Sequence, residues 1–150
     1  MTGAPGKSAG LHHIVTAITH SEDETAAAGR DLAPTLSAGS VVLLRGDLGA
    51  GKTAFVRGLA EGLGVSPAEV SSPTFTLMQE YRGGRVPLVH VDLYRLDDPR
   101  EIDDLGLEEV GLACVLAVEW AEKWPRAPVD AARVTIAHAG DTERLITIET

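Results

Sequence analysis

The segment Gly46–Thr53 is the feature that most restricts how this chain can fold. It reads GDLGAGKT and satisfies the pattern G-x-x-x-x-G-K-[ST], which requires a strand directly before it and a helix directly after it. Both flanks meet this requirement. Val41–Arg45 is a short run of β-branched and apolar residues, as in a buried strand, and Phe55, Leu59 and Leu63 recur at four-residue spacing, as on one face of a helix. The sequence therefore predicts a strand–loop–helix unit of an α/β protein.

The residue types of this segment suit the binding of phosphate groups. Glycines let successive backbone N–H groups turn inward, and the following helix directs the positive end of its dipole at the same point. Lys52 adds a mobile charge for β- and γ-phosphates, and the Thr53 hydroxyl is placed to bind Mg²⁺. The motif predicts a phosphate-binding loop (P-loop) for ATP and Mg²⁺. Its residues are Gly46, Asp47, Leu48, Gly49, Ala50, Gly51, Lys52 and Thr53.

Two apolar runs each end in a single acidic residue. These runs are Leu88–Asp92 and Val115–Glu119. A Mg²⁺ ion bound with a nucleotide keeps several waters and takes only one or two protein ligands, so a carboxylate at a neighbouring strand end is the partner that the loop requires. Each acid could also be a solvated loop carboxylate. The presence of both favours a metal-binding or water-positioning role for Asp92, Glu119 or the pair.

The segment after residue 20 carries the signals of a first helix. Ser21 and Glu24 have the spacing of a capping box, and an alanine-rich stretch follows. We predict a helix over Glu22–Leu36 that Pro34 kinks or ends near Ala33, because proline cannot donate a helical hydrogen bond.

The remainder of the chain alternates between strand and helix patterns and completes the predicted fold. We expect a mixed parallel/antiparallel central sheet flanked by helices, in one α/β P-loop domain. A short helix is expected over Pro99–Val110, and the expected strands are Thr74–Tyr81, Val86–Asp92, Ala113–Glu119, Arg133–His138 and Arg144–Glu149.

Composition sets the size and class of the protein. A chain of 150 residues that is 44% hydrophobic can bury one core, so we expect a single domain over residues 12–150. Residues 1–11 are small and polar and are predicted to be a disordered extension. The apolar runs are far shorter than the ~20 residues of a membrane span. The sole cysteine, Cys114, cannot form an internal disulfide, which favours a cytoplasmic protein with a buried thiol.

The net charge of -9 opposes binding to a phosphate backbone. Direct contact with nucleic acid would require a local basic patch, so the expected partners are other proteins.

Several segments of the chain together resemble the TsaE family (formerly YjeE), the small ATPase of bacterial tRNA threonylcarbamoyladenosine biosynthesis. The resemblance covers most of the chain and is much more specific than a P-loop alone. The segments that carry it are Leu44–Thr53, then Ser72–Leu77 (SPTFTL), then His90–Leu96 (HVDLYRL), and Val118–Trp120 (VEW).

This resemblance implies a function and a set of roles. It implies Mg²⁺-dependent ATP hydrolysis on behalf of the TsaB–TsaD partner complex, which modifies adenosine 37 of tRNA. Thr53 and Glu119 would ligate Mg²⁺, Asp92 would lie beside the phosphates or the attacking water, and Ser72–Thr74 would act as a switch loop. Lys52, Asp92, Glu119 and Thr74 are the implied catalytic residues.

Two further residues, Glu22 and Arg144, would approach the nucleotide by the same resemblance. The chain diverges from the family in both regions. Purely structural roles are the alternatives for three of these assignments. Ser72–Thr74 could be a turn leading into a strand, Trp120 an ordinary core residue and Arg144 a solvated strand residue.

Two other functions use the same loop. A small-molecule kinase would transfer the γ-phosphoryl group to an acceptor beneath an Arg-rich lid, for which only Arg82 and Arg85 are available around a short turn. A nucleotide-dependent switch would change shape between ATP and ADP states with negligible hydrolysis.

Overall fold

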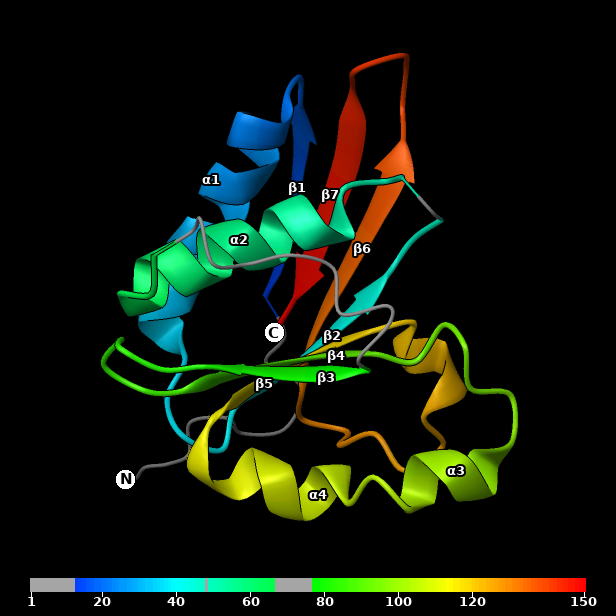
Figure 1. Ribbon diagram of the computed structural model, residues 1–150. Helices are drawn as coiled ribbons and strands as arrows, with labels where there is room; N and C mark the ends of the chain where they lie inside the picture. Colours follow the sequence, from blue (N-terminus) through cyan, green and yellow to red (C-terminus); the bar gives the residue numbers. More distant parts are fainter. Residues whose placement is uncertain (1–12, 48, 67–76) are drawn as a thin grey trace.

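A single seven-stranded sheet forms the centre of the molecule (Figure 1). The computed structural model describes residues 13–47, 49–66 and 77–150. The strands are β1 (Ile14–Thr19), β2 (Val41–Arg45), β3 (Met78–Tyr81), β4 (Leu88–Asp92), β5 (Val115–Glu119), β6 (Ala132–His138) and β7 (Arg144–Glu149). The α-helices are α1 (Glu22–Leu32), α2 (Lys52–Leu63), α3 (Pro99–Asp103) and α4 (Leu107–Val110).

The sheet is mixed, as the sequence predicts. Its strand order is β1-β7-β6-β2-β5-β4-β3. The four central strands β6, β2, β5 and β4 run parallel, whereas β3 pairs antiparallel with β4 at one edge. β7 pairs antiparallel with β6, and β1 with β7, at the other edge. Both predicted hairpins, β3–β4 and β6–β7, are confirmed.

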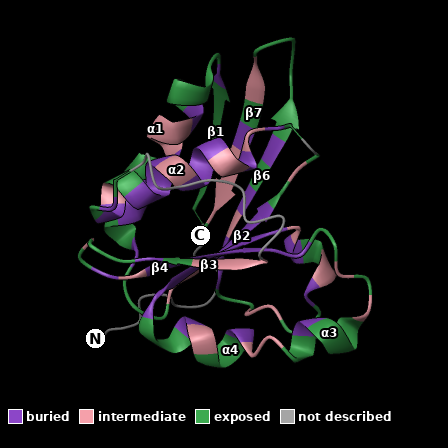
Figure 2. Ribbon diagram, in the orientation of Figure 1, coloured by how far each residue is buried: buried purple, intermediate pink, exposed green. Residues whose placement is uncertain are grey.

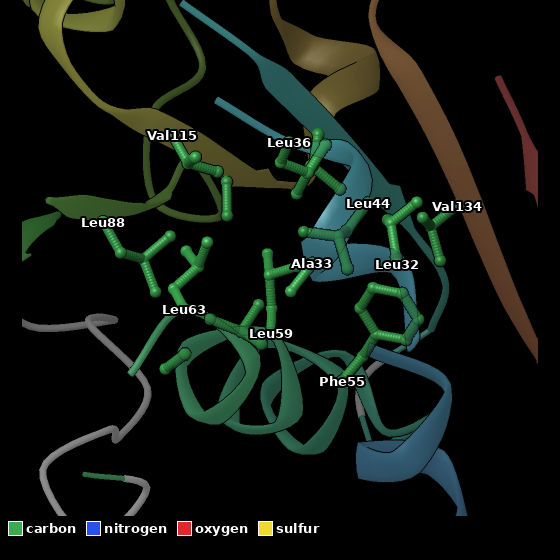
Figure 3. Packing of buried hydrophobic residues seen from close by; sticks show 14 of the residues in the cluster. Leu32, Ala33, Leu36, Leu44, Phe55, Leu59, Leu63, Leu88, Val115 and Val134 are labelled. Atoms are coloured by element: carbon green, nitrogen blue, oxygen red, sulfur yellow. The ribbon is translucent and has the colours of Figure 1, made fainter. Parts of the chain in front are cut away.

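Helices cover both faces of the central strands, with α1 and α2 on one side and α3 and α4 on the other (Figure 1). Because side chains alternate along a strand, Leu44 faces α2 while Leu43 joins the other core. This two-sided cover explains why most residues of β2, β4 and β5 are apolar and buried (Figure 2). Figure 3 shows Leu59 and Leu63 of α2 reaching toward Leu88 on the sheet.

Helices α1 and α2 cross with their backbones in direct contact, which fixes the helix that follows the P-loop. A Cβ atom added at Gly58 would lie 1.7 Å from the carbonyl oxygen of Ala26, and one added at Gly29 would lie 2.1 Å from that of Phe55. Only glycine permits so close an approach.

The ends of α1 and α2 follow their local signals. The Ser21 Oγ accepts a hydrogen bond from the Glu24 N–H at 3.1 Å, which caps the start of α1. The helix ends at Leu32, and Pro34 lies in a 3₁₀ turn over Ala33–Thr35, so the ending expected near Ala33 is confirmed and the outer limit at Leu36 is too long. α2 ends at Gly64 in the left-handed region (φ 95°).

Other predicted boundaries need correction. The expected helix over Pro99–Val110 is two short helices, because Gly106 adopts a left-handed conformation (φ 66°) between them. β4 begins after Pro87, since proline has no N–H for the sheet, rather than at Val86. β5 begins at Val115 because a 3₁₀ turn occupies Gly111–Ala113.

Some predictions lie partly or wholly outside the described residues. These include the extension over residues 1–11 and the predicted strand residues before Leu77. Cys114 is buried at 3% exposure, as expected, and burial raises the pKa of its thiol. No described helix is both long and apolar enough to cross a membrane.

Candidate functional site

The site lies where parallel strands end at the same edge of the sheet. β2 leads into the P-loop, β5 is its neighbour, and β4 is the next strand along. The registers pair Leu44 with Glu119 and Glu119 with Asp92. The two predicted carboxylates are therefore side by side at the carboxyl edge, where open α/β sheets bind their ligands.

The glycines of the P-loop are required by its backbone. Gly46, Gly49 and Gly51 have φ of 153°, 78° and 111°, a region that other residues rarely adopt. A Cβ atom at Gly46 would also lie 2.5 Å from the carbonyl oxygen of Ile136. Gly51 caps α2 without any side chain, which leaves the first N–H groups of the helix for an anion.

A cleft of ≈ 260 Å³ opens at this loop. It is lined by Glu22, Gly49, Gly51, Lys52, Thr53, Ala54, Arg57, Asp92, Glu119 and Trp120. A larger cleft of ≈ 830 Å³ lies at the opposite end of the strands, and its described lining contains Asp31 and Asp130 but no Lys or Arg. The smaller cleft is therefore the one with the chemistry to bind phosphate.

Lys52 is held against the loop itself. Its ammonium group donates to the carbonyl oxygens of Gly46 and, at 3.0 Å, Asp47, and it lies 4.6 Å from the ring centroid of Trp120. Burial lowers the pKa of Lys52, while the charges of Glu119 and Asp92 act in the opposite direction. The ammonium group thus donates to neutral carbonyl oxygens of the P-loop. A charged phosphate is a stronger acceptor and can replace them.

The two carboxylates have different partners. Asp92 is buried, and its Oδ1 accepts a hydrogen bond from the Tyr94 N–H at 2.9 Å. Glu119 is also buried, and its Oε2 accepts from the Thr53 hydroxyl at 3.4 Å. The same oxygen lies 2.5 Å from the Nε2 of His90.

These donors fit Mg²⁺ bound together with a nucleotide. Among the described residues, no cluster of three His, Cys, Asp or Glu side chains could hold a metal alone. Mg²⁺ does not need one, because it takes one or two carboxylates and completes its shell with phosphate oxygens and water. The Thr53 hydroxyl and the Glu119 carboxylate lie in contact and could supply two oxygen ligands, and Asp92 pairs with Glu119 on the neighbouring strand.

Comparison with known proteins decides the family. A family model described as "Threonylcarbamoyl adenosine biosynthesis protein TsaE" matches residues 19–146. The chain belongs to the TsaE family. It is 46% identical over 132 residues to the tRNA threonylcarbamoyladenosine biosynthesis protein TsaE of Bacillus subtilis, covering 86% of this chain and 81% of that protein. The equally named protein of Nostoc sp. is 46% identical over 119 residues, covering 75% and 72%.

A solved structure shares the fold of this chain. The crystal structure of Bacillus subtilis YdiB superposes with a TM-score of 0.73 at 35% identity, covering 95% of this chain and 88% of that one. The resemblance in the P-loop, HVDLYRL and VEW segments is thus confirmed as membership of the TsaE family, and the mixed α/β fold is shared.

Most of the site residues suggested by TsaE resemblance come together in space. Lys52, Thr53, Asp92 and Glu119 line one cleft, and Glu22 joins them. Leu48, Thr74 and the segment 72–74 lie outside the described residues.

Arg144 contacts the P-loop through its guanidinium group. Its Nε donates to the carbonyl oxygen of Ala50 at 3.0 Å, and its Nη2 donates to that of Gly49 at 3.3 Å. The reading of Arg144 as a merely solvated strand residue is therefore wrong. It braces the loop by donating to two of its backbone carbonyl oxygens.

Sequence reasoning missed two residues of this TsaE-family site. Arg57 lines the cleft, and its position one helical turn after Thr53 could have revealed it. His90 contacts Glu119, and its place two residues before Asp92 put it on the same face of β4. Trp120, for which ordinary core was an alternative, faces Lys52 and lines the cleft.

Proposed function

We propose that this TsaE-family chain hydrolyses ATP with Mg²⁺ and that this hydrolysis supports the threonylcarbamoylation of adenosine 37 in tRNA. The observation that carries the proposal is the cleft in which the P-loop, Lys52 and two strand-end carboxylates converge. Its conformational cycle would act on the TsaB–TsaD complex, with no small-molecule acceptor of its own. The pathway is supported by the names of the B. subtilis and Nostoc relatives. The proposal places the protein in the cytoplasm with the tRNA that TsaB–TsaD modifies.

Four side chains of the cleft have a defined task in the proposed reaction. The Lys52 ammonium exchanges the carbonyl oxygens of Gly46 and Asp47 for the β- and γ-phosphates. Thr53 and Glu119 would hold Mg²⁺, which when bound would supply positive charge to neutralise the phosphates. Asp92 orients the water that attacks the γ-phosphorus, and ADP leaves. The chain then needs no covalent intermediate.

The decisive experiment is ATP hydrolysis measured with and without TsaB–TsaD. We expect slow turnover by the chain alone and faster turnover with the partners. The variants Thr53→Ala, Asp92→Ala and Glu119→Ala should each lower the rate about 10²-fold or more, since each removes a group that acts on the transition state. Lys52→Ala serves as the inactive reference, and turnover no greater than this reference under both conditions would refute the ATPase proposal.

The kinase alternative loses its structural support. The Arg85 Nη2 donates to the carbonyl oxygens of Ala33 and Leu36 at 2.7 and 2.8 Å, which ties it to the end of α1. Arg82 pairs with Glu80 at 2.9 Å. Neither arginine lines the described cleft. Transfer of label from γ-labelled ATP to a metabolite would revive the kinase.

The switch alternative is tested by the affinity of the chain for its partners in each nucleotide state. A switch protein would bind TsaB–TsaD with different affinities in the ATP and ADP states and hydrolyse ATP negligibly. Equal affinities in both states would count against it.

A further inference from the structure

We infer that His90 is a positioning residue for the metal site, and that its imidazole holds the Glu119 carboxylate in the orientation that binds Mg²⁺. The inference rests on the proposed function in one respect, namely that Glu119 is a metal ligand. It adds a residue from the middle of β4 that touches neither the cleft nor the phosphates.

His90 and Glu119 are joined beneath the site in the buried interior. His90 has 0% exposure and Glu119 4%. Their strands are adjacent and parallel, and His90 pairs with Ala117. Glu119 is two residues after Ala117 on β5, so its side chain lies on the same face of the sheet as that of His90. The Nε2 of His90 lies 2.5 Å from the Oε2 of Glu119. The contact therefore comes from the sheet and does not depend on a loop.

The hydrogen bonds of Glu119 fall on one of its two oxygens. Oε2 accepts from both His90 and the Thr53 hydroxyl. Within the described part of the chain, Oε1 has no hydrogen-bond partner. This division fixes the plane of the carboxylate from below and leaves one oxygen for a metal ion, as expected of a ligand oriented by an outer hydrogen bond.

Packing alone does not account for a histidine at this position. A carboxylate only accepts hydrogen bonds, so the imidazole donates through Nε2. Its Nδ1 is buried and has no hydrogen-bond partner among the described residues. A buried nitrogen without a partner costs free energy, and an apolar side chain of similar size would avoid that cost. The Nε2 donor is the feature of histidine that the site uses.

Loss of the donor should affect metal binding and spare phosphate binding. The phosphates contact the P-loop, which His90 does not touch. Removal of the outer hydrogen bond to a metal ligand typically weakens metal affinity 10–100-fold. The predicted signature is an altered Mg²⁺ requirement with unchanged nucleotide affinity in its absence.

The test measures binding of a fluorescent ADP analogue to the full chain, first with EDTA and then as Mg²⁺ is added. His90→Leu removes the donor, while His90→Gln keeps an N–H near the position of Nε2. We expect all variants to bind alike in EDTA. The Mg²⁺ concentration at the midpoint should rise about 10–100-fold in His90→Leu and stay within a few-fold of wild type in His90→Gln. Val89→Ala, a buried change on the opposite face of β4, is the matched control.

A double-mutant cycle separates positioning from general damage. In a Glu119→Gln background, His90→Leu should cause no further shift of the Mg²⁺ midpoint, because the ligand that it positions is already altered. A full additional shift would overturn the inference, as would a wild-type midpoint in folded His90→Leu. If His90→Leu does not fold, His90→Asn replaces it, since its shorter amide does not reach Glu119. Equal midpoints in the Asn and Gln variants then overturn the inference.

The outcomes also distinguish this inference from the proposed function. Wild-type protein that binds the analogue more tightly with Mg²⁺ but never hydrolyses ATP refutes the ATPase and leaves the role of His90 standing. Wild-type protein whose nucleotide binding ignores Mg²⁺ refutes the role of His90.

Discussion

At the scale of single residues, Lys52 combines burial with a positive charge. It is 5% exposed, and burial lowers its pKa from the usual value of 10.5 against the opposing effect of Glu119 and Asp92. Between the lowered pKa and 10.5 the unfolded chain binds more protons at this lysine than the folded chain. Lys52 therefore makes the free energy of unfolding rise with pH in that window.

The first prediction concerns this titration. In NMR spectra of protein labelled at lysine Cε, the Lys52 resonance should titrate below the ordinary lysine value of 10.5. Addition of ADP should raise the pKa of Lys52, because phosphate charges favour the ammonium form. Lys52→Arg assigns the resonance. A pKa of Lys52 at or above 10.5 would contradict the prediction.

The second prediction concerns the arginine that braces the P-loop. Arg144→Ala should weaken binding of a fluorescent ADP analogue about 5–10-fold. The variant removes the hydrogen bonds that Arg144 donates to the carbonyl oxygens of Gly49 and Ala50, so part of the binding free energy is used to order the loop. Arg133→Ala, which removes a contact only to the carbonyl oxygen of Val129, is the control. Equal affinities of the two variants would show that Arg144 does not brace the loop.

Local patterns in the sequence predicted four residues of the site and missed both Arg57, which lines the cleft, and His90, which lies behind Glu119. Lys52 and Thr53 are defined by a contiguous motif, and Asp92 and Glu119 by apolar runs that end in an acid. The contact of His90 with Glu119 depends on the register of two strands, which sequence periodicity does not give. The register becomes visible only in the folded sheet.

At the scale of elements, the crossing of α1 and α2 determines where the P-loop helix lies. The third prediction is that Gly58→Ala lowers the free energy of unfolding by about 3 kcal/mol or more, because the new Cβ meets the backbone of Ala26 and the helices must separate. Denaturant unfolding measures this change. Glu61→Ala, an exposed change on the same helix, should cost less than about 1 kcal/mol, allowing for loss of its surface contact with Arg30. A stabilised Gly58→Ala protein would contradict the observed crossing.

Elements with strong local signals were predicted, whereas β1 and a break within one expected helix were not. The Ser21 cap and Pro34 bracket α1 in the sequence. The division between α3 and α4 was missed, because it depends on the backbone conformation of Gly106. β1 was not predicted. Five of its six residues are exposed, and it is held at the sheet edge by β7, more than a hundred residues later in the chain. Its strand state comes from pairing and not from burial of an apolar face.

At the scale of the whole molecule, the sheet brings the P-loop, the strand-end acids and the brace on β7 to one edge, while the cores hold the strands from both faces (Figure 1). The described residues share one sheet that carries the candidate nucleotide site. The proposed function assigns contact with tRNA to TsaB–TsaD and nucleotide turnover to this chain.

The fourth prediction concerns that division of labour. The isolated chain, with a net charge of -9, should show no binding to labelled tRNA up to ~100 µM protein at 0.15 M salt, because affinity for nucleic acid comes largely from cations that neutralise phosphates. Fluorescence anisotropy measures this, with TsaB–TsaD as the binding control. Micromolar affinity that falls steeply with added salt would reveal a basic surface strong enough to overcome the net charge. If the chain associates with tRNA only when TsaB–TsaD is present, the partners bind the tRNA. Nucleotide turnover by the chain would then act on the modifying complex through protein contacts alone.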